Sequence, residues 1–132
     1  MKFSDISQEQ WDELQPYLDT CVLPVTALRG NEAPYETTAA LERLRDLLDT
    51  LEIPYKGRVV TYPAFHYADS VQADIEALSR TALRLKEEQF RYVIVACLDE
   101  SFKNYELDGV DLILIPGDPT RETVEALWRS QL

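Results

Sequence analysis

Hydrophobic positions along the chain form two kinds of pattern: continuous apolar runs of strand length, and longer stretches in which apolar residues return every three or four positions. The runs 92–98 and 110–116 are apolar at almost every position, as expected of strands buried on both faces of a sheet. Leu41, Leu44 and Leu48 share one face of a helix. The whole pattern predicts strands at 21–28, 57–62, 92–98 and 110–116, and helices at 8–15, 35–51, 71–85 and 119–128.

The first predicted helix has a complete start signal. Ser7 can cap the helix, and Gln10 three residues later closes a capping box. Ile6 and Trp11 stand at the positions of a hydrophobic staple. The residues before and inside this helix therefore fix where it begins.

Other boundaries follow from single residues. Asp69 or Ser70 can cap the third helix. Asp118 is the expected cap of the last helix, with Pro119 at its first position. Pro24 interrupts the hydrogen-bond ladder of the first strand and suggests a bulge there.

Helices and strands alternate along the chain, and this order predicts an α/β fold. We expect one three-layer domain over residues 1–132, with a mostly parallel sheet of four strands in the order 2-1-3-4 and helices on both faces. The direction of the last strand stays open, because the connector 99–109 has about the minimum length of a parallel crossover.

Charge and composition narrow the classes of partner. The formal net charge is −11, which opposes binding to nucleic acid or to an anionic membrane surface. No apolar run approaches the ~20 residues that span a bilayer, and the start of the chain does not read as a signal peptide. Cys21 and Cys97 lie in apolar runs and do not form a CxxC pair. We therefore interpret them as buried thiols of a protein from a reduced compartment. We expect a cytoplasmic protein.

Candidate chemistry gathers where the predicted parallel strands end, since ligands of such sheets bind beyond the carboxyl ends of the strands. His66 is the single histidine of the chain and follows the second strand. Asp99 and Glu100 follow the third strand, and together with His66 they are the candidate acid–base residues. The candidates for ligand binding at the same rim are Arg29, Asn31, Ser101 and Asp118.

Each candidate also has a plain structural interpretation. Asp99 can cap a short helix in the connector while Glu100 faces water. His66 can be a loop histidine that is hydrogen-bonded to its surroundings. The sequence contains no metal-binding motif and no glycine-rich phosphate loop, so we expect no metal and no cofactor.

Three segments resemble the YpiF-like family of uncharacterised proteins from Bacillus-like Gram-positive bacteria. These segments are "YLDTCVLPV", "GRVVTYPAFHY" and "FRYVIVACLDESFKNYELDGVDLILIP". The resemblance implies a cytoplasmic bacterial domain of unknown function, and it supplies no catalytic residue. It draws attention to Asp19 before the first strand and to Arg58 at the start of the second. We expect these two residues to form a structural ion pair that fixes strand register.

Three hypotheses of function remain open. The favoured one is a non-enzymatic accessory or regulatory domain that acts through protein–protein contact, with Phe102, Tyr105 and Trp128 as exposed candidates. The second is a small-molecule hydrolase or transferase that uses the carboxylates at the strand ends. The third is a regulatory domain that binds a metabolite through Arg29 and Asn31. The partner and the oligomeric state are not determined by the sequence.

Overall fold

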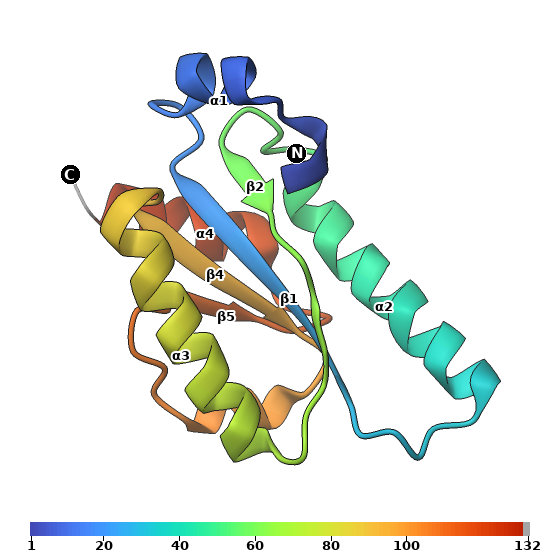
Figure 1. The fold of residues 1–132 in the computed structure, drawn as a ribbon. Coiled ribbons are helices and arrows are strands. Elements are labelled where there is room, and N and C mark those ends of the chain that lie inside the picture. The colour runs from blue at the N-terminus through green and yellow to red at the C-terminus, as the bar shows by residue number, and fades with distance from the viewer. Residues whose placement is uncertain (131–132) are drawn as a thin grey trace.

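The computed structural model describes residues 1–130, which form an α/β fold with a parallel sheet (Figure 1). Four α-helices and five strands occur in this part of the chain. The strands are β1 (Thr20–Leu28), β2 (Val59–Thr61), β3 (Phe65–Tyr67), β4 (Tyr92–Cys97) and β5 (Leu112–Leu114). The helices are α1 (Gln8–Leu14), α2 (Pro34–Glu52), α3 (Val71–Glu88) and α4 (Thr120–Arg129), with short 3-10 helices η1 (Phe3–Asp5) and η2 (Glu100–Asn104).

The sheet differs from the expected one by an additional strand. Its hydrogen-bonded path runs β2-β1-β4-β5, and β3 pairs with β1 outside this path. The prediction of a four-stranded sheet in the order 2-1-3-4 was therefore wrong. The sheet has five strands, and β3 adds a pairing that this order does not contain. The sequence predicts a loop at residues 65–67, because Pro63 ends the preceding apolar run. The last strand, whose direction the sequence left open, pairs with β4 in parallel.

Strand β1 is the centre of the sheet because it pairs with three other strands. Thr20 lies opposite Val59 of β2 and Tyr92 of β4, and the β4 pairing continues without interruption to Val25. The register with β3 shifts between Val25 and Leu28. Ala27 in that interval has φ +62°, a left-handed conformation that is uncommon outside glycine. The irregularity expected at Pro24 is thus displaced toward the carboxyl end of the strand.

Helices cover both faces of the sheet and bury two groups of apolar side chains. On one face α3 packs through Ile75, Leu78 and Ala82 against residues that include Val93 and Val95 of β4. On the other face α2 and α4 pack against alternate residues of the same strands, such as Ile94 and Ala96. Figure 1 shows α1 above the upper end of the sheet and α3 crossing its face as a single helix. Among residues 1–130, no helix has both the length and the apolar character needed to cross a membrane.

Helix boundaries follow the capping residues with one exception. Ser7 and Gln10 form the expected capping box, in which the Ser7 side chain accepts from the Gln10 N–H and the Gln10 side chain accepts from the Ser7 N–H. Ser70 caps α3. The prediction that Asp118 caps the last helix was wrong, because Pro119 occupies the cap position. The carboxylate of Asp118 instead accepts from the Ile115 N–H, 3.0 Å away.

An ion pair joins the amino ends of the strands. Arg58 donates from Nε to Asp19 Oδ1 at 2.9 Å and from a terminal nitrogen to Oδ2 at 3.1 Å. The Asp19 carbonyl accepts the N–H groups of Arg91 and Tyr92 just before and at the start of β4. The guanidinium lies over the Trp128 ring of α4, with its carbon 4.0 Å from the ring centroid. One arginine thus connects the beginnings of β1, β2 and β4 with the last helix.

We expect Arg58→Ala to lower the free energy of unfolding by about 2 kcal/mol, because the partly buried Asp19 carboxylate loses its bidentate partner and Trp128 loses its cation. The two side chains are 37% and 25% exposed, so solvent screening keeps the cost below that of a fully buried pair. Urea unfolding followed by circular dichroism measures the change.

The matched control is Arg45→Ala, which removes an arginine from an exposed pair with Asp46. We expect this control to cost about 0.5 kcal/mol or less. Equal effects of the two substitutions would contradict the structural role assigned to Arg58.

Candidate functional site

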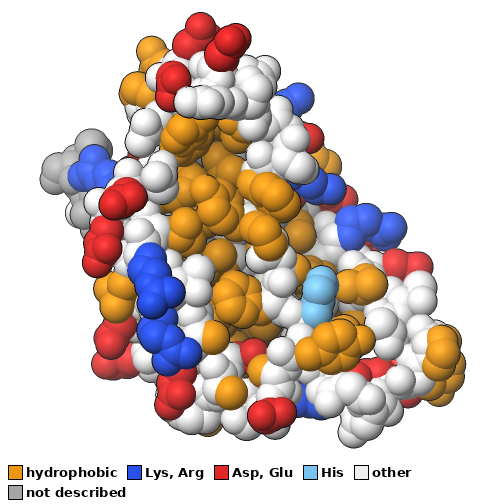
Figure 2. All heavy atoms as spheres, in the orientation of Figure 1, with side chains coloured by type: hydrophobic (Ala, Val, Ile, Leu, Met, Phe, Trp, Pro, Cys, Tyr) orange, Lys and Arg blue, Asp and Glu red, His pale blue; other side chains and the backbone are white. Residues whose placement is uncertain are grey.

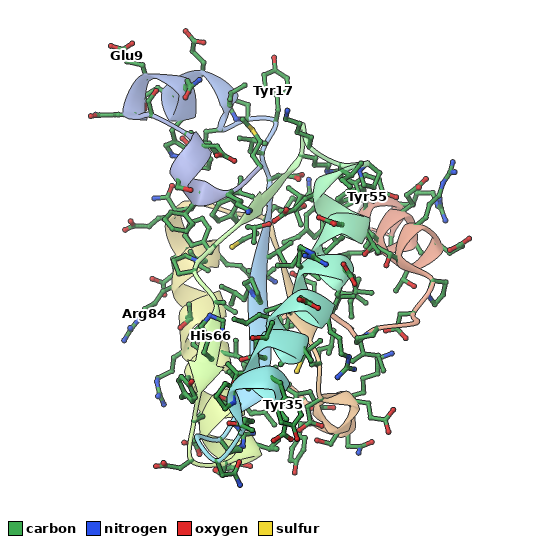
Figure 3. All side chains as sticks on the ribbon, turned by 90° about the vertical axis from the view of Figure 1, so that its right-hand side faces the viewer. Glu9, Tyr17, Tyr35, Tyr55, His66 and Arg84 are labelled. Carbon is green, nitrogen blue, oxygen red and sulfur yellow. The ribbon has the colours of Figure 1, made fainter. Side chains whose placement is uncertain are left out.

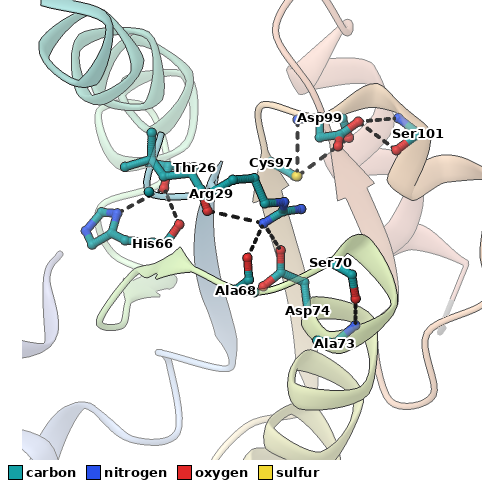
Figure 4. Close-up of polar contacts among 12 residues, drawn as sticks. Thr26, Arg29, His66, Ala68, Ser70, Ala73, Asp74, Cys97, Asp99 and Ser101 are labelled. Atoms are coloured by element: carbon teal, nitrogen blue, oxygen red, sulfur yellow. Dashed lines mark hydrogen bonds and ion pairs between the residues drawn. The ribbon is translucent and has the colours of Figure 1, made fainter. Parts of the chain in front are cut away.

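The carboxyl ends of the strands carry a chain of polar contacts centred on Arg29 (Figure 4). Its Nη1 donates to the carbonyls of Leu28 and Ala68 at 3.2 and 3.3 Å and to Asp74 Oδ2 at 3.2 Å. Arg29 follows β1, and Asp74 lies in the first turn of α3. These contacts tie the end of β1 to the segment between β3 and α3. Arg29 therefore already has three acceptors within the protein.

Asp74 is the residue of this rim that sequence reasoning missed. It is 4% exposed and lies on the same helix face as Ile75 and Leu78. Burial raises the pKa of the Asp74 carboxyl above its ordinary value, and the Asp99 charge adds to this effect, whereas the hydrogen bond and charge of Arg29 oppose it. The signal was present in the sequence, since an acid three residues after Val71 interrupts the apolar stripe of α3.

Asp99 and Ser101 bind each other at the start of η2. Asp99 Oδ1 accepts from the Ser101 N–H at 3.0 Å and from the Ser101 hydroxyl at 2.7 Å. This is the geometry of a helix cap. The Asp99 N–H points to Cys97 Sγ at 3.3 Å. Burial raises the pKa of the Cys97 thiol to about 12, so Cys97 is a protonated, buried side chain at neutral pH, and Cys21 is also buried.

His66 lies in strand β3, whereas the sequence predicted that it lies in a loop. Its Nδ1 is 3.1 Å from Thr26 Oγ1, and the same hydroxyl donates to the His66 carbonyl at 3.2 Å. Figure 4 shows His66 and Asp99 at opposite ends of the group of contacts, with Arg29 between them. Within residues 1–130 no hydrogen bond or ion pair joins His66 to Asp99. The structure therefore does not bring the three acid–base candidates into one cluster.

The remaining rim candidates are dispersed. Asn31 and Glu100 are exposed. Asp118 forms an ion pair with Lys103 at 2.7 Å. Burial alone would raise the pKa of Asp118, but the Lys103 bond and charge and the Ile115 N–H outweigh it and lower that pKa. In the described part of the chain no group of three or more His, Cys, Asp or Glu side chains could hold a metal ion.

A second candidate site lies on the face of the sheet that carries α3. A hollow of about 500 Å³ is lined mainly by apolar side chains from η1, α1 and β2. Figure 2 shows hydrophobic side chains gathered in this depression below α1. Its floor contains Val60 and Tyr62, and Phe3, Ile6 and Trp11 form its upper wall. We call the part of the surface formed by these five residues the apolar hollow.

The apolar hollow exists because the helices cover this face unevenly. Helix α3 packs over β1 and β4, while α1 has only seven residues and covers the end of the sheet. Trp11 packs on Phe90 with ring centroids 5.6 Å apart, and Tyr62 contacts the same ring edge-on at 5.4 Å. Phe3 remains 48% exposed. Phe3 is thus the most exposed residue of the apolar hollow, whereas Ile6, Trp11 and Tyr62 are half-buried and Val60 is buried.

Two of the three aromatic residues expected on the surface are placed differently. Phe102 is fully buried at 0% exposure. Trp128 is half-buried beneath Arg58, and its indole N–H donates to Thr20 Oγ1 at 3.0 Å. Only Tyr105 of the three is exposed, at 43%. The prediction of an aromatic contact surface at these residues was therefore wrong. The residues Ile6 and Trp11, which form the hydrophobic staple, were the better indication of an apolar surface.

Comparison with known proteins gives a family without an assigned activity. A family model described as "Protein of unknown function (DUF2487)" matches residues 9–130. No curated protein and no solved structure matches the chain significantly.

We expect Asp74→Asn to change the pH dependence of stability. Because the folded pKa of Asp74 is raised above the ordinary 3.8, its contribution is fully present below that value and is lost as pH rises through the folded pKa. Wild type should therefore lose stability relative to Asp74→Asn as the pH rises from below 3.8 toward neutrality. Urea unfolding of both proteins at a series of pH values gives the difference.

Asp118→Asn is the control of opposite sign. The folded pKa of Asp118 is lowered from 3.8, so its contribution is present above that value and is lost as pH falls through the folded pKa. If the two substitutions shifted the pH dependence in the same direction, the assignment of Asp74 as a carboxyl dominated by burial would be wrong.

Proposed function

The chain belongs to the DUF2487 family, whose description assigns no activity, and we propose that it is a non-enzymatic accessory or regulatory domain that acts by binding a protein chain through the apolar hollow. The proposal includes a single domain over residues 1–132, a cytoplasmic location and a YpiF-like bacterial origin. The exposed apolar surface beside β2 is the observation that carries it.

The character of the apolar hollow supports protein contact. Contiguous apolar surface that is rimmed by polar residues is typical of protein interaction sites. Aromatic side chains supply much of the lining here, and they are enriched in the centres of interfaces. Phe3 and Tyr62 contact each other at a centroid distance of 6.1 Å and offer two aromatic rings to a partner. Covering them would remove apolar area from water.

The two other hypotheses receive less support from the rim. An acid–base enzyme needs its catalytic groups within hydrogen-bond reach of one substrate, whereas Asp99 is bound to Ser101 and His66 to Thr26. A metabolite site based on Arg29 would have to share a guanidinium whose Nη1 already serves three acceptors within the protein. Neither hypothesis has an observation in its favour that matches the apolar hollow.

We expect a photoreactive benzoylphenylalanine at Phe3 to form covalent protein adducts in cells that produce this protein, because Phe3 lies at the open wall of the apolar hollow and is 48% exposed. The same group at Tyr35 is the matched control, since Tyr35 is 77% exposed at the start of α2. Gel electrophoresis and mass spectrometry of the adducts give the result.

Adducts at position 3 that are absent at position 35 support protein binding by the apolar hollow. No adduct at position 3, or the same adducts at both positions, would refute the proposed function.

A further inference from the structure

We propose that residues 1–5 form a strap that closes the outer edge of β2 in the free protein, and that a partner binds by replacing this strap with an extended segment of its own. The inference rests on the proposed function and names the way in which a partner binds beside the apolar hollow. The observation that carries it is the seat of the strap itself, because the strap already lies on β2 as an added strand would.

The strap pairs with β2 in parallel. The Thr61 N–H donates to the Met1 carbonyl at 2.7 Å, Met1 N donates to the Val59 carbonyl at 2.9 Å, and Lys2 is the pairing partner of Thr61. Strand β2 ends the path β2-β1-β4-β5, so these bonds occupy the outward backbone groups of an edge strand. Figure 1 shows the amino end of the chain, marked N, beside β2. The strap therefore displays how a further strand docks on this edge.

Few contacts hold the strap to the rest of the fold. Its other hydrogen bonds stay within residues 1–6: the Lys2 N–H donates to Asp5 Oδ2, and the Asp5 N–H donates to the Lys2 carbonyl, both at 2.9 Å. Residues 2–5 are all exposed, and none of them forms an ion pair with another described residue. The strap thus leaves β2 as a unit when two backbone bonds and the apolar contacts of Met1 and Phe3 break.

The hinge of the strap lies at Ile6. This residue is extended, with φ −116° and ψ 118°, and it stands between the strap and the capping box that fixes the start of α1 at Ser7. Helix α1 is anchored independently of the strap, because Trp11 packs on Phe90. Opening therefore moves residues 1–5 and leaves α1 in place.

The closed strap carries a polar cost. In the described part of the chain, two buried side-chain oxygens have no hydrogen-bond partner within the protein, Thr61 Oγ1 and Glu52 Oε1. Both belong to residues next to the strap, since Lys2 pairs with Thr61 and lines a small hollow together with Glu52. Buried polar atoms without partners cost free energy that contact with water recovers. Opening admits water to this corner of the fold, and so it costs less than the broken contacts alone require.

The strap also specifies the chemistry of the segment that replaces it. Opening frees the Thr61 N–H and the Val59 carbonyl, and it uncovers the Tyr62 ring on which Phe3 packs at 6.1 Å. An extended segment that runs parallel to β2 pairs with the two backbone groups and places an apolar, preferably aromatic, side chain on Tyr62. Addition of a strand to an open sheet edge is a common mode of peptide recognition, in which backbone bonds supply affinity and side-chain pockets supply specificity. The apolar hollow is the pocket in this case.

The first measurement is native-state hydrogen exchange of two adjacent amides at the end of β2. The Thr61 N–H is bound to the strap, whereas the Tyr62 N–H donates to the Val22 carbonyl of β1 at 2.9 Å. Local opening of the strap exposes only the first of them. After correction for intrinsic rates, we expect Thr61 to exchange at least about 100-fold faster than Tyr62, at a rate that low urea concentrations leave unchanged. Similar rates for the two amides would overturn the inference, because strap and sheet would then open together.

Phe3→Ser removes the ring that the strap places on Tyr62. We expect this variant to raise the Thr61 exchange rate by a further ~10-fold and to leave the Tyr62 rate unchanged. The matched control is Tyr17→Ser, which also removes an exposed aromatic ring near α1. Figure 3 shows Tyr17 pointing away from the sheet, so we expect the control to change neither rate. An effect of Phe3→Ser no larger than that of Tyr17→Ser would contradict the role of the strap.

The probe of replacement is a synthetic peptide of residues 1–7, added to the full-length Phe3→Ser protein. A short tether gives the strap an effective concentration of millimolar order, so the peptide at ~5 mM competes with the weakened strap. We expect the peptide to slow Thr61 exchange by about 10-fold, back to the wild-type rate, whereas the peptide that carries Phe3→Ser has no effect. Absence of this protection, or equal protection by both peptides, would overturn the inference.

The crosslink at Phe3 separates this failure from that of the proposed function. Adducts at position 3 without protection by the peptide retain the proposed function and remove strand replacement as its mode. The absence of adducts at position 3 refutes the proposed function and the inference that rests on it, whatever the exchange rates.

Discussion

The ion pair between Arg58 and Asp19 is the contact on which the order of the sheet depends most directly. A parallel sheet has no hairpins to set its register, so the starts of its strands must be aligned by other contacts. Here one carboxylate at the start of β1 binds the arginine before β2, and the carbonyl of the same residue binds the first N–H groups of β4. Trp128 adds α4 to this assembly by lying under the guanidinium and donating to Thr20.

At the opposite ends of the strands the polar groups satisfy one another instead of remaining available. Arg29 binds two carbonyls and Asp74, Asp99 binds Ser101, and His66 binds Thr26. Buried or half-buried polar groups without partners are costly, and here each of these has found one inside the protein. At the location that commonly holds ligands in parallel sheets, these side chains thus hold loops to strands.

The apolar hollow is a part of the surface that has no internal contacts of this kind. A three-layer fold must cover both faces of its sheet, and the four helices do so unequally: α2 and α4 cover one face, while α3 and the short α1 share the other. The uncovered area lies beside β2, next to the short acidic helix α1. Our interpretation of the protein as one that works by contact follows from this imbalance of coverage.

The sequence by itself determined the elements whose signals are local. The capping box at Ser7, the periodic leucines of α2 and the continuous apolar run of β4 depend on neighbours within a few residues, and the structure contains all three. The pairing of Asp19 with Arg58 was anticipated because both residues precede neighbouring strands. Only the tertiary structure decided the strand at His66, the burial of Phe102 and Asp74, and the extent of the apolar hollow. These depend on contacts between distant segments, and local periodicity carries no information about which distant segment covers a given side chain.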